Sequence, residues 1–118
     1  MSLPSKSYPF MNGVPELLIL RELANGEMYS YQLVRSIQAK TRDAISLSEG
    51  CVYPLVHALE RKGWLASRRA TAEGRVRVYY RLTPKGGKRL QKLSARWNEL
   101  SSAIGAVMGG RHEQPRMV

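Results

Sequence analysis

The chain of 118 residues is long enough for one domain with a modest hydrophobic core, and its 19 Lys and Arg against 9 Asp and Glu give a net charge of +10, which favours an anionic partner such as nucleic acid or a membrane surface. The single cysteine, Cys51, excludes an intramolecular disulfide and is compatible with a reducing compartment. No apolar run approaches the roughly 20 residues of a membrane span and the chain start lacks the pattern of a signal peptide, so we expect a soluble, cytoplasmic protein. Of the two anionic partners we expect nucleic acid and no membrane.

The first part of the chain predicts an arm followed by two helices. Residues 1–12, with two prolines and several serines, are expected to form a flexible N-terminal arm. Residues 14–24 have Pro15 at a first helical position and leucines at helical spacing, which predicts the first helix. A second helix is expected from Ser30, as its N-cap, to Lys40, and its spacing predicts burial of Leu33, Val34 and Ile37.

Residues 46–62 predict a third helix with two distinct faces. Its apolar positions follow the i, i+3, i+4, i+7 spacing of one buried stripe, formed by Val52, Leu55, Val56 and Leu59. The opposite surface carries polar, aromatic and basic side chains that are available to another molecule, namely Tyr53, His57 and Arg61. The pattern therefore predicts a helix that packs with one face and recognises a partner with the other.

The sequence alone does not decide where this third helix begins. Ser46 with Glu49 three residues later fits a capping box, and Ser48 is a competing N-cap. Pro54 is unfavourable inside a helix because it lacks an amide hydrogen and clashes with the carbonyl four residues earlier. Either regular helix begins near Tyr53, or a longer helix is distorted in its first two turns.

The same stretch resembles the recognition helix of the PadR-like winged-helix transcriptional regulators. The hallmark of that family is Gly-x-x-Tyr-Pro followed by Leu-Glu and Gly, and residues 47–63 contain it as Gly50, Tyr53-Pro54, Leu59-Glu60 and Gly63. The resemblance extends from residue 14 to about residue 100, with small departures at Ser30, where glycine is usual, and at Cys51, where threonine is common. It implies a DNA-binding transcriptional regulator, most often a repressor.

Two segments after the third helix predict a basic β-hairpin. Residues 75–82 alternate apolar and basic or aromatic side chains with the period of a half-buried strand, and they pair with residues 64–70 across a short loop. Two strands after a helix-turn-helix form the wing of a winged helix. The hairpin's predicted phosphate contacts, near which only Glu73 is acidic, are Arg68, Arg69, Arg75 and Arg77. The plainer interpretation is a solvated strand face.

Thr83 and Pro84 predict the start of a long last helix over residues 84–108, followed by a mobile tail over residues 109–118. Gly86 and Gly87 are expected to weaken its first turn. Its apolar positions are spaced alternately by three and four, as in a coiled coil, which predicts a homodimer interface. We call these positions the C-terminal stripe: Leu90, Leu93, Trp97, Leu100, Ile104 and Val107.

The candidate DNA contacts of the third helix are Ser48, Tyr53, His57 and Arg61. We expect Tyr53 to contact the DNA backbone and His57 to reach a base edge, although both residue types are also common as partly buried core residues. The first turns offer no Arg or Asn for a strong bidentate base contact, which leaves Ser48 and the backbone as further candidates.

Trp97 and Cys51 each have a structural and a functional interpretation. Packing in the dimer interface explains Trp97 sufficiently, whereas the family resemblance implies that a small aromatic or lipophilic effector can enter between the terminal helices and stack on it. Cys51 is a small packing residue rather than a redox sensor, because no second cysteine can resolve an oxidised thiol.

Together these features predict a mainly α fold with a small β-hairpin: a winged helix-turn-helix domain over residues 13–83 and a dimerisation helix over residues 84–108. The predicted function is sequence-specific regulation of transcription by a homodimer on double-stranded DNA, at a roughly palindromic operator. We expect no catalytic residue, metal site or cofactor, since the two histidines, His57 and His112, lie far apart and no ligand spacing is present. The alternatives are a winged-helix module that docks onto an acidic protein and a nonspecific nucleic-acid-binding protein.

Overall fold

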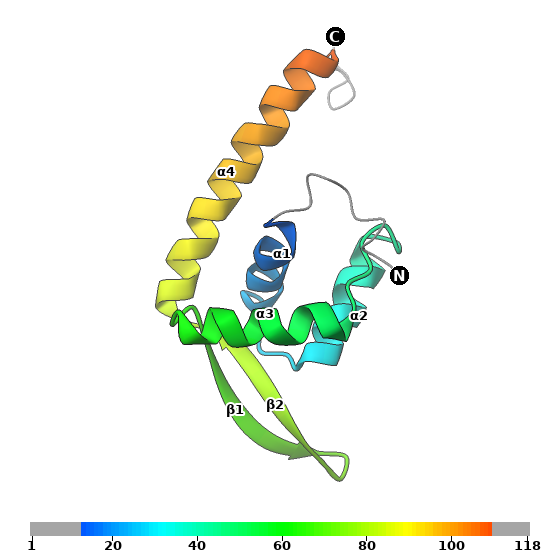
Figure 1. The fold of residues 1–118 in the computed structure, drawn as a ribbon, viewed down its shortest axis with the longest axis vertical. Helices are drawn as coiled ribbons and strands as arrows, with labels where there is room; N and C mark the ends of the chain where they lie inside the picture. Colours follow the sequence, from blue (N-terminus) through cyan, green and yellow to red (C-terminus); the bar gives the residue numbers. More distant parts are fainter. Residues whose placement is uncertain (1–12, 110–118) are drawn as a thin grey trace.

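A computed structural model of the protein describes residues 13–109, which contain four helices and one two-stranded hairpin (Figure 1). In chain order the elements are α1 (Val14–Leu23), α2 (Ser30–Lys40), α3 (Glu49–Arg61), β1 (Leu65–Ala72), β2 (Arg75–Leu82) and α4 (Pro84–Met108). The mainly α winged-helix prediction is confirmed. The expected arm over residues 1–12 and nearly all of the expected tail lie outside the described residues.

The structure corrects the expected N-cap of α2 and decides between the two alternatives for the start of α3. Tyr29, not Ser30, is the N-cap of α2, and its amide donates to Oε1 of Gln32 at 3.1 Å, so the prediction for Ser30 is wrong. At α3 the N-cap is Ser48, whose Oγ accepts from the amide of Cys51 at 3.1 Å. The helix then runs through Pro54, which selects the longer of the two expected helices.

The hydrophobic core lies between α1, α2 and α3 and is closed by residues from the hairpin and α4. All three residues expected to be buried on α2 are buried, and on α3 Leu55 is half-buried while the other three members of its stripe are buried. The core residues are Ile19, Leu20, Leu23, Leu33, Val34, Ile37, Leu47, Val52, Val56, Leu59, Leu65, Tyr80 and Leu90.

The hairpin is anchored at its base and extends away from the core (Figure 1). Its register pairs Leu65 with Leu82 at the base and Ala72 with Arg75 at the tip. The α1–α2 loop adds an isolated bridge, in which the amides and carbonyls of Met28 and Tyr80 exchange hydrogen bonds of 3.1 and 2.9 Å. The loop that enters α2 is therefore joined directly to the wing.

The junction between the hairpin and α4 is tightly packed. Thr83 is the N-cap of α4: its Oγ1 accepts from the amide of Gly86 at 3.0 Å and donates to the carbonyl of Gly63 at 2.7 Å. A Cβ on Gly86 would lie 2.0 Å from the carbonyl oxygen of Trp64, while a Cβ on Gly87 would meet nothing within 4 Å. Gly86 thus permits a close approach between the backbones of α4 and Trp64. From the sequence we expect it only to weaken the helix.

Helix α4 and the hairpin leave the core in opposite directions (Figure 1). Of the C-terminal stripe, Leu90 is buried in the core of its own chain and Leu93 packs against that core. Its outer members are exposed by 47% at Trp97, 50% at Leu100, 51% at Ile104 and 86% at Val107. Among residues 13–109, none of the helices combines the length and apolar character needed to cross a bilayer.

Candidate nucleic-acid interface

The exposed face of α3 carries an aromatic pair in its middle. Tyr53 is 55% exposed, and its ring centroid lies 4.3 Å from that of His57 with the planes tilted by 46°. His57 is half-buried, and its ring is 6.4 Å from the buried ring of Tyr80 on β2. The pair leaves the Tyr53 hydroxyl accessible at the surface and restrains His57 between α3 and the hairpin.

The two ends of α3 offer different chemistry. At the N-terminal end Ser48 is exposed, and although its oxygen accepts the Cys51 amide, its hydroxyl hydrogen remains able to donate. At the C-terminal end Arg61 is exposed in the last turn, where a cation also complements the helix dipole. The four candidate contacts on α3 therefore span its length on the surface left free by the core.

The strand register divides the predicted wing arginines between two faces. Cross-strand partners share a face, so Arg68, Arg75 and Arg77 lie together, with Tyr79 and Arg81. Arg69 is paired with Val78 and lies on the other face. Arg69 therefore does not share a face with the other three predicted phosphate contacts, because neighbouring residues of a strand point in opposite directions.

Arg69 lies on the face of the hairpin against which α3 packs. On that face, two residues nearer the base of β1, the Ser67 hydroxyl donates to Glu60 of α3 at 2.6 Å. Further toward the tip, the apolar residue Val76 on the same face is 64% exposed. Toward the tip, this face of the hairpin is therefore not covered by the rest of the protein and is exposed.

A compact set of side chains joins the other face of the hairpin to the α1–α2 loop. Tyr29 meets Tyr79 edge to face at 5.5 Å between centroids, and the Arg77 guanidinium carbon lies 4.2 Å from the Tyr29 ring centroid. Arg68 covers Tyr79 at 5.3 Å and forms a two-point ion pair with Glu27, including Nε to Oε1 at 3.0 Å. We call this set the wing clamp: Glu27, Tyr29, Arg68, Arg77 and Tyr79.

The wing clamp changes the electrostatics expected for the hairpin. Hydrogen bonds from Arg68 lower the pKa of the Glu27 carboxyl, so a carboxylate lies opposite this arginine of the wing. The expectation that only Glu73 lies near the wing arginines is therefore wrong. Glu27 lies 41 residues before Arg68, and no local pattern in the sequence signals that pairing.

The sequence also did not indicate three side-chain contacts that brace the helices. Glu22 on α1 is 6% exposed and accepts the Ser36 hydroxyl at 2.6 Å and the Lys40 ammonium at 2.9 Å, both from α2. Glu16 on α1 accepts from Arg89 Nε on α4 at 2.9 Å. These contacts fix α1 against its neighbours and thereby fix α4 relative to the domain.

The comparisons with known proteins agree with this architecture. The model of the "Transcriptional regulator PadR-like family" matches residues 19–92. The chain is 31% identical over 102 residues to the transcriptional regulator Rv3488 of Mycobacterium tuberculosis, covering 86% of this chain and 90% of that protein.

Two solved structures show the same fold. A transcriptional regulator from Clostridium thermocellum superposes with a TM-score of 0.75 at 29% identity, covering 82% of this chain and 94% of the other. A PadR family transcriptional regulator from Eggerthella lenta gives 0.71 at 30% identity and 82% coverage of each chain. Members of the family are transcriptional regulators rather than enzymes, and the chain belongs to the PadR-like transcriptional regulator family.

Proposed function

We propose that the protein is a transcriptional repressor that binds double-stranded DNA at a roughly palindromic operator as a homodimer. The observation that carries the proposal is the exposed face of α3, where Tyr53 and His57 are held on a helix whose opposite face is fixed in the core. A helix held in this way can enter a major groove, with side chains on its outer face contacting phosphates and base edges.

The wing supplies the electrostatic part of the interface. Arg69, on the side of the hairpin next to α3, and the exposed Arg75 at the tip contact DNA phosphates. Arg68 and Arg77 belong to the wing clamp and hold the hairpin at a fixed angle to the helices. The four predicted phosphate contacts of the wing are thereby divided into two arginines that bind DNA and two that position the hairpin.

The dimer brings two copies of α3 to one DNA molecule. The exposed outer members of the C-terminal stripe are typical of a helix-helix interface, since proteins rarely leave a contiguous row of large apolar side chains exposed to water. Two-fold symmetry places the two α3 helices in successive major grooves, about 34 Å apart. The operator then has the same two-fold symmetry as the protein.

A mobility shift on DNA fragments that flank the protein's own gene tests the proposal. If the dimer neutralises about 6 to 10 phosphates, affinity falls about 10³- to 10⁵-fold between roughly 50 and 200 mM salt. We expect a salt-sensitive complex that survives excess competitor DNA. Loss of every complex to competitor favours nonspecific nucleic-acid binding, and failure to bind any DNA favours docking onto an acidic protein partner.

A second proposal concerns release from DNA by an effector. The indole of Trp97 is 47% exposed on the projecting part of α4, where a second chain or a planar ligand can cover it. We propose that a small aromatic or lipophilic molecule binds between the two α4 helices against Trp97. In a Trp64→Phe background, such a ligand should quench the remaining tryptophan fluorescence and weaken the operator complex over the same concentration range; quenching without weakening contradicts the regulatory role.

A further inference from the structure

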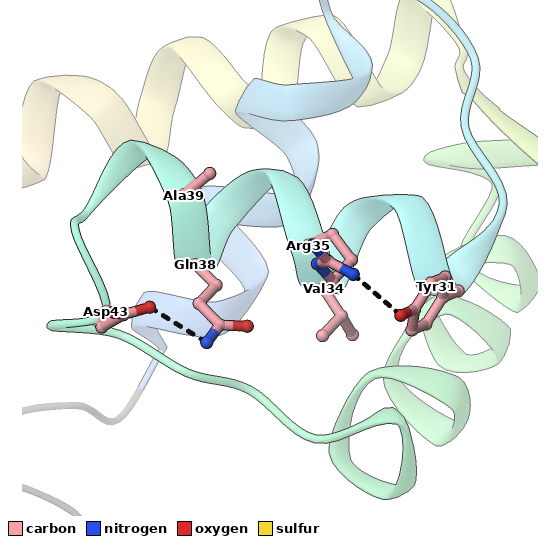
Figure 2. Close-up of a pocket in the computed structure, with 6 residues that line it drawn as sticks. All are labelled: Tyr31, Val34, Arg35, Gln38, Ala39 and Asp43. Carbon is pink, nitrogen blue, oxygen red and sulfur yellow. Dashed lines mark hydrogen bonds between the residues drawn. The ribbon is translucent and has the colours of Figure 1, made fainter.

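An open groove of about 470 Å³ runs along the outer face of α2 (Figure 2). It combines apolar, aromatic and charged side chains, and its lining residues are Tyr31, Val34, Arg35, Gln38, Ala39 and Asp43. The predicted DNA contacts lie on α3 and the wing, so this surface is outside them.

Tyr31 and Arg35 form a preorganised pair of donors at one end of the groove. One guanidinium nitrogen, Nη1, donates to the Tyr31 hydroxyl oxygen at 2.9 Å, and both residues are exposed on adjacent turns of α2 (Figure 2). Because the hydroxyl oxygen accepts from the arginine, its own hydrogen is directed to another acceptor. The remaining guanidinium N–H groups are also available, so the pair presents two kinds of donor to one anion.

The charge of Arg35 is not neutralised by a neighbouring carboxylate within the described part of the chain. The ion pairs among residues 13–109 are Lys40–Glu22, Arg68–Glu27 and Arg89–Glu16. Asp43, the acidic residue of the groove, instead accepts from Gln38 Nε2 at 3.0 Å at the other end (Figure 2). Arg35 therefore differs from Arg68, whose partner is supplied by the chain itself.

The pair lies on the helix that precedes α3 in the helix-turn-helix. In Figure 2 the chain passes from Asp43 beneath α2 toward the side of Arg35 and Tyr31 before α3 begins, and Figure 1 shows the same end of α3 next to α2. When the second helix of such a motif enters the major groove, the first helix crosses the adjacent DNA backbone. A phosphodiester is thus the anion that this position meets.

We propose that Tyr31 and Arg35 bind a DNA phosphate beside the groove entered by α3, which extends the interface from α3 and the wing onto α2. This inference rests on the proposed function. Arg35 supplies charge and several N–H donors, as guanidinium groups do at phosphates, and Tyr31 holds the guanidinium and donates its own hydroxyl.

The test is the salt dependence of operator binding by three variants of the full-length protein. Arg35→Ala should weaken binding to all DNA sequences alike and reduce the slope of log K against log salt by about 0.9 for each phosphate that is no longer neutralised. Tyr31→Phe should weaken binding with an unchanged slope, since it removes a neutral donor. Lys92→Ala removes the same charge from an exposed position on α4 and should leave the slope unchanged.

Thermal melting first establishes that each variant is folded. If Arg35→Ala has the slope of the wild type and of Lys92→Ala, the inference is overturned while the proposed function stands. If the wild type forms no competitor-resistant complex, the proposed function itself fails. An altered sequence preference with an unchanged slope also overturns the inference, because it identifies Arg35 as a base contact.

Discussion

The start of α3 is capped by Ser48 and not by Ser46, which lies two positions earlier. Ser48 Oγ accepts the amide of Cys51, whereas Ser46 is exposed and precedes the helix. Ser48→Ala should lower the free energy of unfolding by about 1 kcal/mol, because it leaves an amide of the first turn without its cap. Ser46→Ala should change it by less than about 0.5 kcal/mol; equal decreases in urea denaturation would contradict this assignment.

The arginines of the wing can be separated by a charge-balanced variant. Arg69→Ala should reduce the salt slope of operator binding by about 0.9 for each phosphate that it neutralises, because Arg69 faces the α3 side of the hairpin. The double variant Glu27→Gln with Arg68→Gln removes one charge of each sign and should leave the slope unchanged. A slope reduced equally by both variants would show that Arg68 binds phosphate despite its ion pair.

Residue types and their spacing could predict much of the interface but not its internal contacts. The buried stripe of α3 predicts which face remains for Tyr53 and His57, and a proline with a threonine before it marks the start of α4. The partner of Arg68 could not be predicted, because Glu27 reaches it only after α1, α2 and the hairpin have packed. The face of Arg69 follows from strand alternation alone and was available from the sequence.

The attachment of helix α4 to the rest of the domain depends on Gly86, the first of two adjacent glycines. A Cβ at Gly86 would lie 2.0 Å from the Trp64 carbonyl oxygen, which is backbone and cannot move aside. Gly86→Ala should lower the free energy of unfolding by about 3 kcal/mol through overpacking.

The neighbouring glycine provides the matched control. Gly87→Ala meets nothing within 4 Å and should raise the free energy of unfolding by about 0.5 to 1 kcal/mol, because alanine is the better helix former. Denaturant unfolding of the two variants measures the difference. A similar effect of both changes would contradict the close approach at Gly86.

This junction shows why helix propensity alone is a poor guide to Gly86. Propensity predicts that two glycines weaken the first turn of α4 equally. The distinction between them arises from tertiary packing of α4 on Trp64, together with Arg89, whose guanidinium carbon lies 4.6 Å from the Trp64 ring centroid. Such a contact joins segments that are separated in the chain by the whole hairpin.

The packed junction between the hairpin and α4 connects the proposed dimer interface to the proposed DNA-binding face. The inner members of the C-terminal stripe are part of the domain core, while its outer members are exposed on the projecting half of α4 (Figure 1). A second chain bound there would have its α3 at a distance fixed by α4. The spacing of operator half-sites is then a property of this helix.

A charge in the exposed part of the stripe should abolish dimer formation without unfolding the domain. Ile104→Asp places a carboxylate at a 51% exposed position, so the chain should remain folded and sediment as a monomer. Ser102→Asp adds the same charge on the other side of the helix and should remain dimeric. A dimeric Ile104→Asp protein in analytical ultracentrifugation would place the interface elsewhere.

The proposed dimer presents two copies of α3 to one symmetric DNA site. Selection of binding sequences for the full-length protein from a random DNA library measures whether the bound site has this symmetry. We predict enrichment of an inverted repeat with half-site centres about one helical turn, or 34 Å, apart. Recovery of unrelated sequences with no common motif would contradict sequence-specific recognition, and a single motif without symmetry would contradict the dimer arrangement.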